Sequence, residues 1–180
     1  MLRRREVVVT GIGLATPLGD SLDRFASALY SYTGCFESIA LAHSRPIPAA
    51  RVHEDTGAGL SRTESAVADR CTRLALLAAT RAFDNAQIAA GDGAPQCGVF
   101  VGCGTGPAES VNEAYASMHS RGRLPALALL RCLPSAAAGA LAVRFGLRGP
   151  AQTFSSACAS SAMAIGEAMR TVRHGYLDVA

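Results

Sequence analysis

The chain of 180 residues is 49% hydrophobic and only 17% charged, which excludes a disordered tail and allows one domain with a real core. Its formal net charge is +3, and no basic stripe is interleaved with aromatic residues, so nothing in it indicates nucleic-acid binding. Aromatic residues are few and glycine is plentiful, a composition that suits closely packed helices better than an aromatic binding platform.

The cysteines predict reduced thiols rather than a disulfide framework or a metal site. They form no CxxC pair and no zinc-type spacing with histidine, and they stand at Cys35, Cys71, Cys97, Cys103, Cys132 and Cys158. This pattern favours a cytoplasmic protein. The start of the chain imitates a signal peptide, but Gly11, Gly13 and Pro17 break its apolar run. No stretch approaches the roughly 20 apolar residues of a membrane span, so we expect no membrane association.

The N-terminal third predicts a strand, a turn and a helix before a long connection. The β-branched run at 6–10 ends at a glycine, which is typical of a buried strand. A turn rich in glycine and proline covers 11–20, and Asp20 is the candidate cap of a helix over 21–32. Prolines and glycines interrupt 33–60, so we expect an irregular surface connection there.

The middle of the chain predicts a long helix, a strand and a second helix. Serine or threonine caps and a helical period of apolar residues predict one helix over 61–86, with Phe83 on its inward face. The segment "QCGVFVGCG" (96–104) predicts a buried strand that ends in a glycine loop. A further helix is expected over residues 107–118.

The C-terminal part continues the alternation of helix and strand. We expect a loop over 121–134, a helix over 135–146, a strand over 149–157, a helix over 158–175 and the start of a strand over 176–180. The first half of the helix expected over 158–175 has small or apolar residues on every side, which predicts that it is buried on all sides. Strand and helix alternation predicts an α/β layered fold with a largely parallel sheet. Because the chain stops inside a strand, we expect it to be the front part of a longer protein.

The segment "TFSSACASSAMAIG" (153–166) places Cys158 where a strand gives way to a helix. The thiolate is the reactive form of cysteine, and a helix N-terminus favours an anion through its unsatisfied N–H groups and about half a positive charge. Small neighbours leave room for a substrate arm, and the Cys158 N–H is a candidate donor to an oxyanion in acyl transfer. The alternative is a structural cysteine, because free cysteine is among the most buried residue types.

Two glycine segments imitate nucleotide-binding loops without completing the motif. Neither "GIGLAT" (11–16) nor "GCGTG" (102–106) completes G-x-G-x-x-G, and Pro17 and Pro107 follow where a phosphate-binding helix would open. Tight turns explain these glycines better, and a packing role explains Cys103 in the second segment. The sequence therefore gives no support for a nucleotide cofactor.

The cysteine segment "SSACASSAMAIG" (155–166) resembles the nucleophile segment of the β-ketoacyl-acyl-carrier-protein synthases, the decarboxylating condensing enzymes of fatty-acid and polyketide synthesis. Three further segments resemble this family in the same order: "VVVTGIGLATPLG" (7–19), "GVFVGCGTG" (98–106) and "LPSAAAGALAVRFGLRGP" (133–150). Together they span nearly the whole chain. The opening turn differs from the starts of the related thiolases and of the coenzyme A-primed synthases, and the nucleophile segment leans toward the elongating fatty-acid type.

The resemblance implies a thiolase-like layered α/β fold, with a mixed sheet and helices on both faces, of which residues 1–180 cover most of the N-terminal half. Cys158 would accept an acyl group from the phosphopantetheine thiol of an acyl carrier protein. The carbanion formed from malonyl-carrier protein by loss of carbon dioxide would then attack that thioester. Both acyl groups arrive on the carrier, so the resemblance implies no further cofactor and no metal.

The resemblance also implies a homodimer or a ketosynthase heterodimer, formed through the strand before the nucleophile. The loop from Leu129 to Leu133 would reach toward the partner's acyl pocket, and Thr105 in the glycine loop would line such a pocket. The family's two catalytic histidines and its lysine lie in its second half. None of the four histidines fits either motif (His43, His53, His119 and His174), and the last is better explained as a helix C-cap. We therefore expect residues 1–180 to be inactive without the second half of the family's domain.

Two hypotheses about function remain at this point. The first is an acyltransferase with Cys158 as its nucleophile. The second is a non-catalytic partner subunit like a chain length factor, although such partners usually lack the cysteine, so Cys158 favours the enzyme. An unrelated α/β binding domain with a structural cysteine is a more remote alternative. The acyl chain length and the pathway (fatty acid, polyketide or polyene) stay open.

Overall fold

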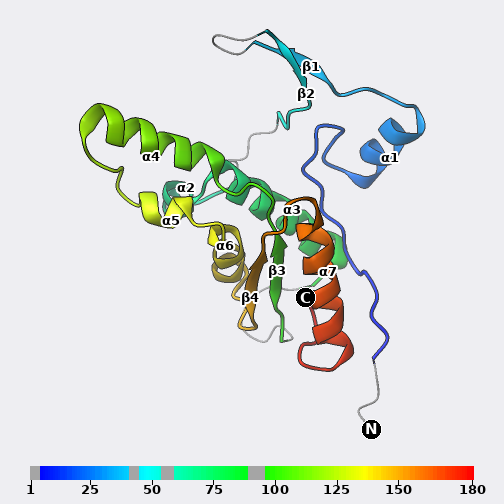
Figure 1. The fold of residues 1–180 in the computed structure, drawn as a ribbon. Helices are drawn as coiled ribbons and strands as arrows, with labels where there is room; N and C mark the ends of the chain where they lie inside the picture. Colours follow the sequence, from blue (N-terminus) through cyan, green and yellow to red (C-terminus); the bar gives the residue numbers. More distant parts are fainter. Residues whose placement is uncertain (1–4, 41–44, 54–58, 89–95) are drawn as a thin grey trace.

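The computed structural model describes residues 5–40, 45–53, 59–88 and 96–180. Its central feature is a parallel strand pair, in register from Val99 opposite Ala151 to Gly102 opposite Phe154. The two strands are β3 (Val99–Gly102) and β4 (Ala151–Phe154). Figure 1 shows helix α6 (Ala136–Phe145) on one side of this pair and helix α7 (Ser160–Arg173) on the other, with helix α3 (Arg70–Ala86) beside α6. The parallel pairing confirms the predicted α/β arrangement.

Apolar residues from α3, α6 and β3 form the core between the helices and the strand pair. Phe83 of α3 stacks on Phe145 of α6 with ring centroids 4.4 Å apart, which confirms the predicted inward position of Phe83. The buried members of the cluster are Leu76, Val99, Ala138, Leu141 and Phe145. The core therefore holds one face of the sheet, and it fixes the strand ends from which the site is built.

The opening segment is not a strand, although residues 6–10 predict one. In the structure these residues form no strand, and Val8 and Val9 are 67% and 80% exposed. A strand is stable only when its backbone groups are paired, and no described strand pairs with this segment. Gly13, in the turn that follows, lies so close to α3 that an added Cβ would collide with the Ala78 carbonyl.

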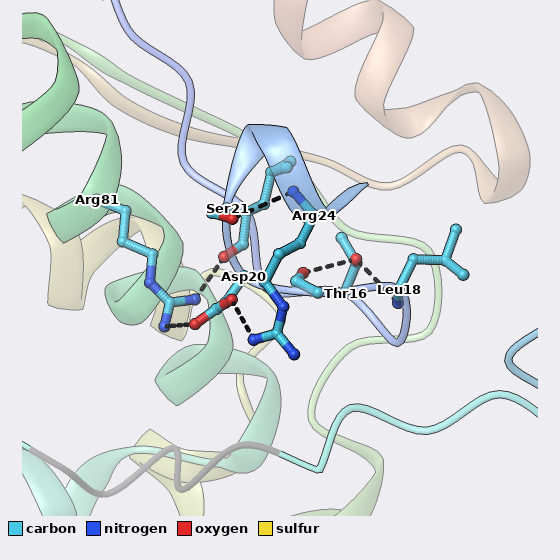
Figure 2. A network of polar contacts seen from close by, with 8 residues as sticks. Thr16, Leu18, Asp20, Ser21, Arg24 and Arg81 are labelled. Atoms are coloured by element: carbon cyan, nitrogen blue, oxygen red, sulfur yellow. Dashed lines mark hydrogen bonds and ion pairs between the residues drawn. The ribbon is translucent and has the colours of Figure 1, made fainter. Parts of the chain in front are cut away.

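A polar network fastens the following turn to α3 (Figure 2). The Arg81 guanidinium of α3 lies 3.6 Å from the Asp20 carboxylate, which also pairs with Arg24 at 3.1 Å. Asp20 is therefore not the helix cap that the sequence predicts. Ser21 accepts the Arg24 N–H instead and caps α1 (Leu22–Tyr30). The freed Asp20 carboxylate serves as the ionic contact between the turn and α3.

The helix predicted over 61–86 is two helices, α2 (Arg62–Val67) and α3. Ala68 between them is extended (φ −92°, ψ 119°), and the Asp69 side chain accepts the Cys71 N–H at 3.0 Å. Asp69 is thus the N-cap of a new helix. A short polar side chain that captures the backbone here outweighs the continuing apolar period.

Two predicted loops contain short regular elements. An antiparallel hairpin lies within 33–60, a range of which residues 41–44 and 54–58 fall outside the described residues. A short helix lies within 121–134, directly after a longer one. The bounds are β1 (Glu37–Ile39), β2 (Ile47–Ala49), α4 (Ala108–Arg121) and α5 (Ala128–Cys132).

Helix α7 is buried on one side only. Ser160 and Ala164 are buried, whereas Met163, Ile165 and Met169 are 48%, 69% and 43% exposed. The expectation of burial all round is therefore wrong for the described chain. The strand pair covers one side of α7, and no element of the described ranges covers the other.

The chain leaves α7 at His174, which is the C-cap, and Gly175 follows with φ +79°. This confirms the cap assignment for His174. The strand expected over 176–180 is reduced to one isolated parallel bridge between Cys97 and Val179. No helix in the described part of the chain is long and apolar enough to cross a membrane.

Candidate active site

Cys158 lies in a tight turn between β4 and α7. The strand ends at Phe154, and a single 3₁₀ turn, η1 (Ala157–Ala159), leads directly into α7. Ala157 has φ +46°, a left-handed conformation that is rare for a residue with a side chain. Such local strain is tolerated where the surrounding structure fixes it, as at functional sites. The turn leaves the Cys158 residue exposed at the start of a helix of 14 residues.

The buried Ser160 hydroxyl holds this turn in shape. It accepts the Ser156 N–H at 2.8 Å and donates to the Ala157 carbonyl at 2.7 Å. Ser160 is only 2% exposed, so both contacts are shielded from water. We define the nucleophile turn as residues 155–160. The sequence argument missed Ser160, although its signal was present as a serine in the first turn of a helix, where hydroxyls capture the local backbone.

The end of β3 packs directly against the start of α7, next to the nucleophile turn. An added Cβ on Gly102 would lie 2.5 Å from both the Cα and the N of Ser161, so only glycine allows this approach. The next residue, Cys103, donates its N–H to the Phe154 carbonyl at 2.9 Å and so extends the pairing of the two strands. These contacts place the carboxyl end of β3 directly beside the start of α7.

The glycine loop, residues 103–107, lies alongside the nucleophile turn. An added Cβ on Gly104 would lie 3.6 Å from the Ala157 carbonyl, which is ordinary contact distance. Thr105 follows Gly104 and is exposed. The structure therefore brings the glycine loop together with the turn that carries Cys158, while the role of Thr105 in an acyl pocket stays a prediction.

The remaining two pocket candidates lie on a different part of the surface. Leu129 of α5 lines an apolar hollow of about 330 Å³ between α4 and α5, together with Tyr115 and Met118. Leu133 is the exposed C-cap of α5 and is not among the lining residues. As formed by the described residues, this hollow is lined by neither Cys158 nor Thr105. The chain alone does not join these leucines to the nucleophile turn.

Two of the other thiols are less suited to nucleophilic attack. Burial, together with the neighbouring Asp69 carboxylate, raises the pKa of the Cys71 thiol to about 11. Burial also raises the pKa of Cys97, which lies within the core beside β3. Cys158, in contrast, is exposed. Access to a substrate therefore favours Cys158 over the partly buried Cys71 and the buried Cys97.

The geometry can support acyl transfer at Cys158. The first N–H groups of a helix have no internal acceptor, and the helix dipole adds about half a positive charge at this end. Both features can stabilise the oxyanion of a tetrahedral intermediate that forms beside the sulfur. An exposed thiol on a hydrogen-bonded turn is accessible to an acyl donor, as covalent catalysis requires.

Two of the three described histidines have partners away from this turn. His53 pairs with Glu37 at 3.1 Å, and His174 caps α7 through the Arg170 carbonyl at 2.8 Å. His119 is an exposed residue in the last turn of α4, and His43 falls outside the described residues. Within the described ranges, no histidine is hydrogen-bonded to Cys158.

Comparison with known proteins agrees with the order of the segments. The family model for the "Beta-ketoacyl synthase, N-terminal domain" matches residues 4–180. A 3-oxoacyl-[acyl-carrier-protein] synthase 2 of Staphylococcus aureus is 27% identical over 99% of this chain and 45% of its own length. Nodulation protein E of Rhizobium meliloti is 31% identical over 97% of this chain and 45% of its own length. The chain thus spans less than half the length of these curated relatives.

Solved structures show the same fold. A β-ketoacyl synthase of Burkholderia phymatum superimposes with a TM-score of 0.79 at 26% identity, over 93% of this chain and 43% of that protein. The ishigamide ketosynthase/chain length factor gives a TM-score of 0.83 at 19% identity, over 96% of this chain and 45% of its own, and shows the fold alone. These likenesses confirm the thiolase-like α/β fold and its N-terminal part. Because the family model matches residues 4–180, which is almost the whole chain, the chain belongs to the β-ketoacyl synthase family.

Proposed function

We propose that this chain is the nucleophile-bearing part of a 3-oxoacyl-acyl-carrier-protein synthase, an acyltransferase in which Cys158 carries the growing acyl group. The observation that carries the proposal is the exposed Cys158 on a strained turn at the start of α7. Family membership supports the reaction class, and the order of β3, glycine loop, β4 and nucleophile turn supports the location of the site.

The proposed reaction begins with transfer of an acyl group to Cys158. The thiolate attacks the carbonyl carbon of an acyl-phosphopantetheine thioester, and a tetrahedral oxyanion forms beside the helix N-terminus. Collapse of this intermediate expels the carrier thiolate and leaves the acyl group on Cys158 as a thioester. The start of α7 stabilises this oxyanion through its free N–H groups and its dipole.

The proposed second stage forms the carbon–carbon bond. Malonyl-carrier protein loses carbon dioxide, and the electron pair of the broken bond forms a carbanion on the carrier thioester. The carbanion attacks the acyl carbonyl on Cys158, and the Cys158 thiolate leaves as the 3-oxoacyl product remains on the carrier. We assign no residue of the described ranges to the decarboxylation. The proposed reaction needs no resident cofactor, because both acyl groups arrive on phosphopantetheine.

We also propose an acyl carrier protein and a second ketosynthase-type subunit as partners. One structural neighbour is a type II polyketide synthase acyl-carrier protein in complex with its ketosynthase, at 19% identity and a TM-score of 0.77. A dimer through β4 is supported by its geometry, because β3 is the only strand beside it within the described residues. The cysteine spacing supports a cytoplasmic location.

The test is a condensation assay on the full-length protein with acyl- and malonyl-carrier protein. We expect a 3-oxoacyl product, and we expect Cys158→Ala to lower its formation by ~10³-fold or more, because the nucleophile is absent. Cys35→Ala, in an ordinary surface segment, is the matched control and retains activity. Full activity of Cys158→Ala would overturn the proposal. An inactive wild type that restores condensation only when paired with a catalytic ketosynthase would favour the partner-subunit alternative.

A further inference from the structure

Helix α4 has no capping side chain of its own. Its N-cap residue is Pro107, which makes no side-chain cap hydrogen bond. Asp69, which precedes α3 in the sequence, supplies the missing acceptor, because its Oδ2 accepts the Ser110 N–H at 2.8 Å. Its Oδ1 accepts the Cys71 N–H at 3.0 Å. One carboxylate therefore caps the first turns of two helices that lie far apart in the sequence.

The contact between Asp69 and Ser110 is shielded from water. Asp69 is 2% exposed, and Ser110 is 3% exposed. Burial alone raises the pKa of the Asp69 carboxyl, but hydrogen bonds from Cys71 and Ser110 outweigh it, and the pKa lies below its usual range. The side chain is thus a buried anion between two helix N-termini, where charge-assisted hydrogen bonds are strong.

The glycine loop is held near its two ends, where the Ser160 hydroxyl donates to the Cys103 carbonyl at 3.4 Å and Pro107 is buried. The first residue of the loop is also fixed by the hydrogen bond from Cys103 to the Phe154 carbonyl. Beyond it, a Cβ added to Gly104 would lie 3.6 Å from the Ala157 carbonyl, and one added to Gly106 would meet no atom within 4 Å among the described residues. The position of the loop therefore depends on its two ends, one on β4 and the other on α4.

We propose that Asp69 is a positioning residue for acyl transfer: by tying the first turn of α4 to the first turn of α3, it holds the glycine loop against the nucleophile turn. The inference rests on the proposed function of Cys158. Asp69 does not touch the reacting atoms. Asp69 acts through Ser110 and the glycine loop. Loss of the Asp69 carboxylate therefore displaces the glycine loop beside the nucleophile turn and leaves the Cys158 thiol itself unchanged.

The test compares two reactions of the same thiol in the full-length protein. The first is single-turnover acylation of Cys158 by an acyl-carrier thioester, which needs the loop in place. The second is alkylation by iodoacetamide, a small reagent that needs only an exposed thiolate. Both rates are expressed per folded molecule for Asp69→Ala and for the isosteric Asp69→Asn. Ser21→Ala, which removes the N-cap of α1, is the control for loss of a helix cap as such.

We expect Asp69→Ala to slow acylation by at least ~10-fold while alkylation changes by less than about 2-fold. The reason is that even a small displacement of a loop that positions the substrate lowers the rate of acyl transfer strongly. Asp69→Asn keeps one acceptor and gives an intermediate rate, which also decides the matter if the alanine variant does not fold. Ser21→Ala lowers the melting temperature without changing acylation. Unchanged acylation in the Asp69 variants, or an equal fall in both reactions, would overturn the inference. A wild type that is never acylated at Cys158 would overturn the proposed function and this inference with it.

Discussion

Gly102 is the residue at which β3 and α7 meet without a side chain between them. Because an added Cβ would lie 2.5 Å from backbone atoms of Ser161, Gly102→Ala must push the start of α7 away from the strand. We expect a loss of about 1 to 3 kcal/mol in the free energy of unfolding, together with slower acylation of the neighbouring Cys158. Urea denaturation and single-turnover acylation of the full-length protein measure the two effects.

Gly139 provides the matched control for this substitution. It lies inside α6, and an added Cβ would meet nothing within 4 Å among the described residues. We expect Gly139→Ala to raise the free energy of unfolding by up to about 1 kcal/mol, because glycine is a poor helix former. If the Gly102 and Gly139 variants behaved alike, close packing of β3 on α7 would not be what fixes the nucleophile turn.

The sequence predicts Cys158 as the candidate nucleophile but does not reveal the residues that hold its turn in place. Cys158 is visible because a cysteine among small residues at a strand–helix junction is itself a local pattern. Asp69 and Ser160 are not visible in this way, because their importance comes from partners. Asp69 binds Ser110, which is 41 residues away, and that proximity exists only after α3 and α4 are packed. Local sequence carries a residue's chemistry, whereas its supports depend on tertiary contacts.

At the scale of elements, an ion pair joins α2 to α6. Arg144 of α6 donates to both carboxylate oxygens of Glu64 at 2.8 and 2.9 Å, and the Ser61 N–H at the start of α2 donates to the same carboxylate. The hydrogen bonds from Arg144 and then Ser61 lower the pKa of Glu64 from 4.5 to about 2. The side chains are only about a quarter exposed, at 28% and 26%, so the pair is partly shielded from solvent.

The depressed pKa gives this contact a definite pH dependence. Its stabilisation is complete above the unfolded value of 4.5 and is lost as the pH falls toward the folded value of about 2. At pH 7 we expect Glu64→Gln to lower the free energy of unfolding by about 1 to 2 kcal/mol, discounted for partial exposure. The difference from wild type shrinks as the pH approaches 3. Urea denaturation of both proteins across this range is the measurement.

Glu167 is the control for this prediction. It pairs with Arg170 one turn along α7, and that arginine is 66% exposed, so Glu167→Gln should change the stability little at any pH. A difference between wild type and the Glu64 variant that stays constant from pH 7 to pH 3 would show that the ion pair with Arg144 is not its source.

Elements with strong local signals are predictable, and their failures have physical causes. The strand–loop–helix order from 96 to 121 and from 149 to 173 is confirmed by β3, α4, β4 and α7. The strand predicted over 6–10 fails because pairing is a property of two segments, and no described strand pairs with this one. The single helix predicted over 61–86 fails because the Asp69 cap overrides the apolar period.

At the scale of the whole molecule, the ends of the described chain meet. Arg5 donates from its backbone to the Arg173 carbonyl at 3.1 Å, and its side chain pairs with Asp178 at 3.0 Å. Both side chains of the ion pair are about half exposed, so it contributes little to stability but brings the opening segment beside the end of α7 (Figure 1). Such closure between distant segments cannot be seen in any local pattern.

The fold class is predictable at this scale, while the burial of α7 is not. Alternating strands and helices specify an α/β layered arrangement, and the ordered resemblance specifies the family. An apolar helix, however, shows only that a surface suits burial, not which segment covers it. Ile165 is apolar and still 69% exposed, because nothing within the described ranges packs on that side of α7.

The central claim is that Cys158 is the nucleophile, and mass mapping of acylated full-length protein tests it most directly. The protein is incubated with an acyl-phosphopantetheine thioester, and the peptides that contain its 6 cysteines are then analysed for the added acyl mass. We predict an adduct on Cys158, absent from Cys158→Ala, with the partly buried Cys71 and the buried Cys97 unmodified. An acyl group on Cys71 or Cys35, with Cys158 unmodified, would contradict the account.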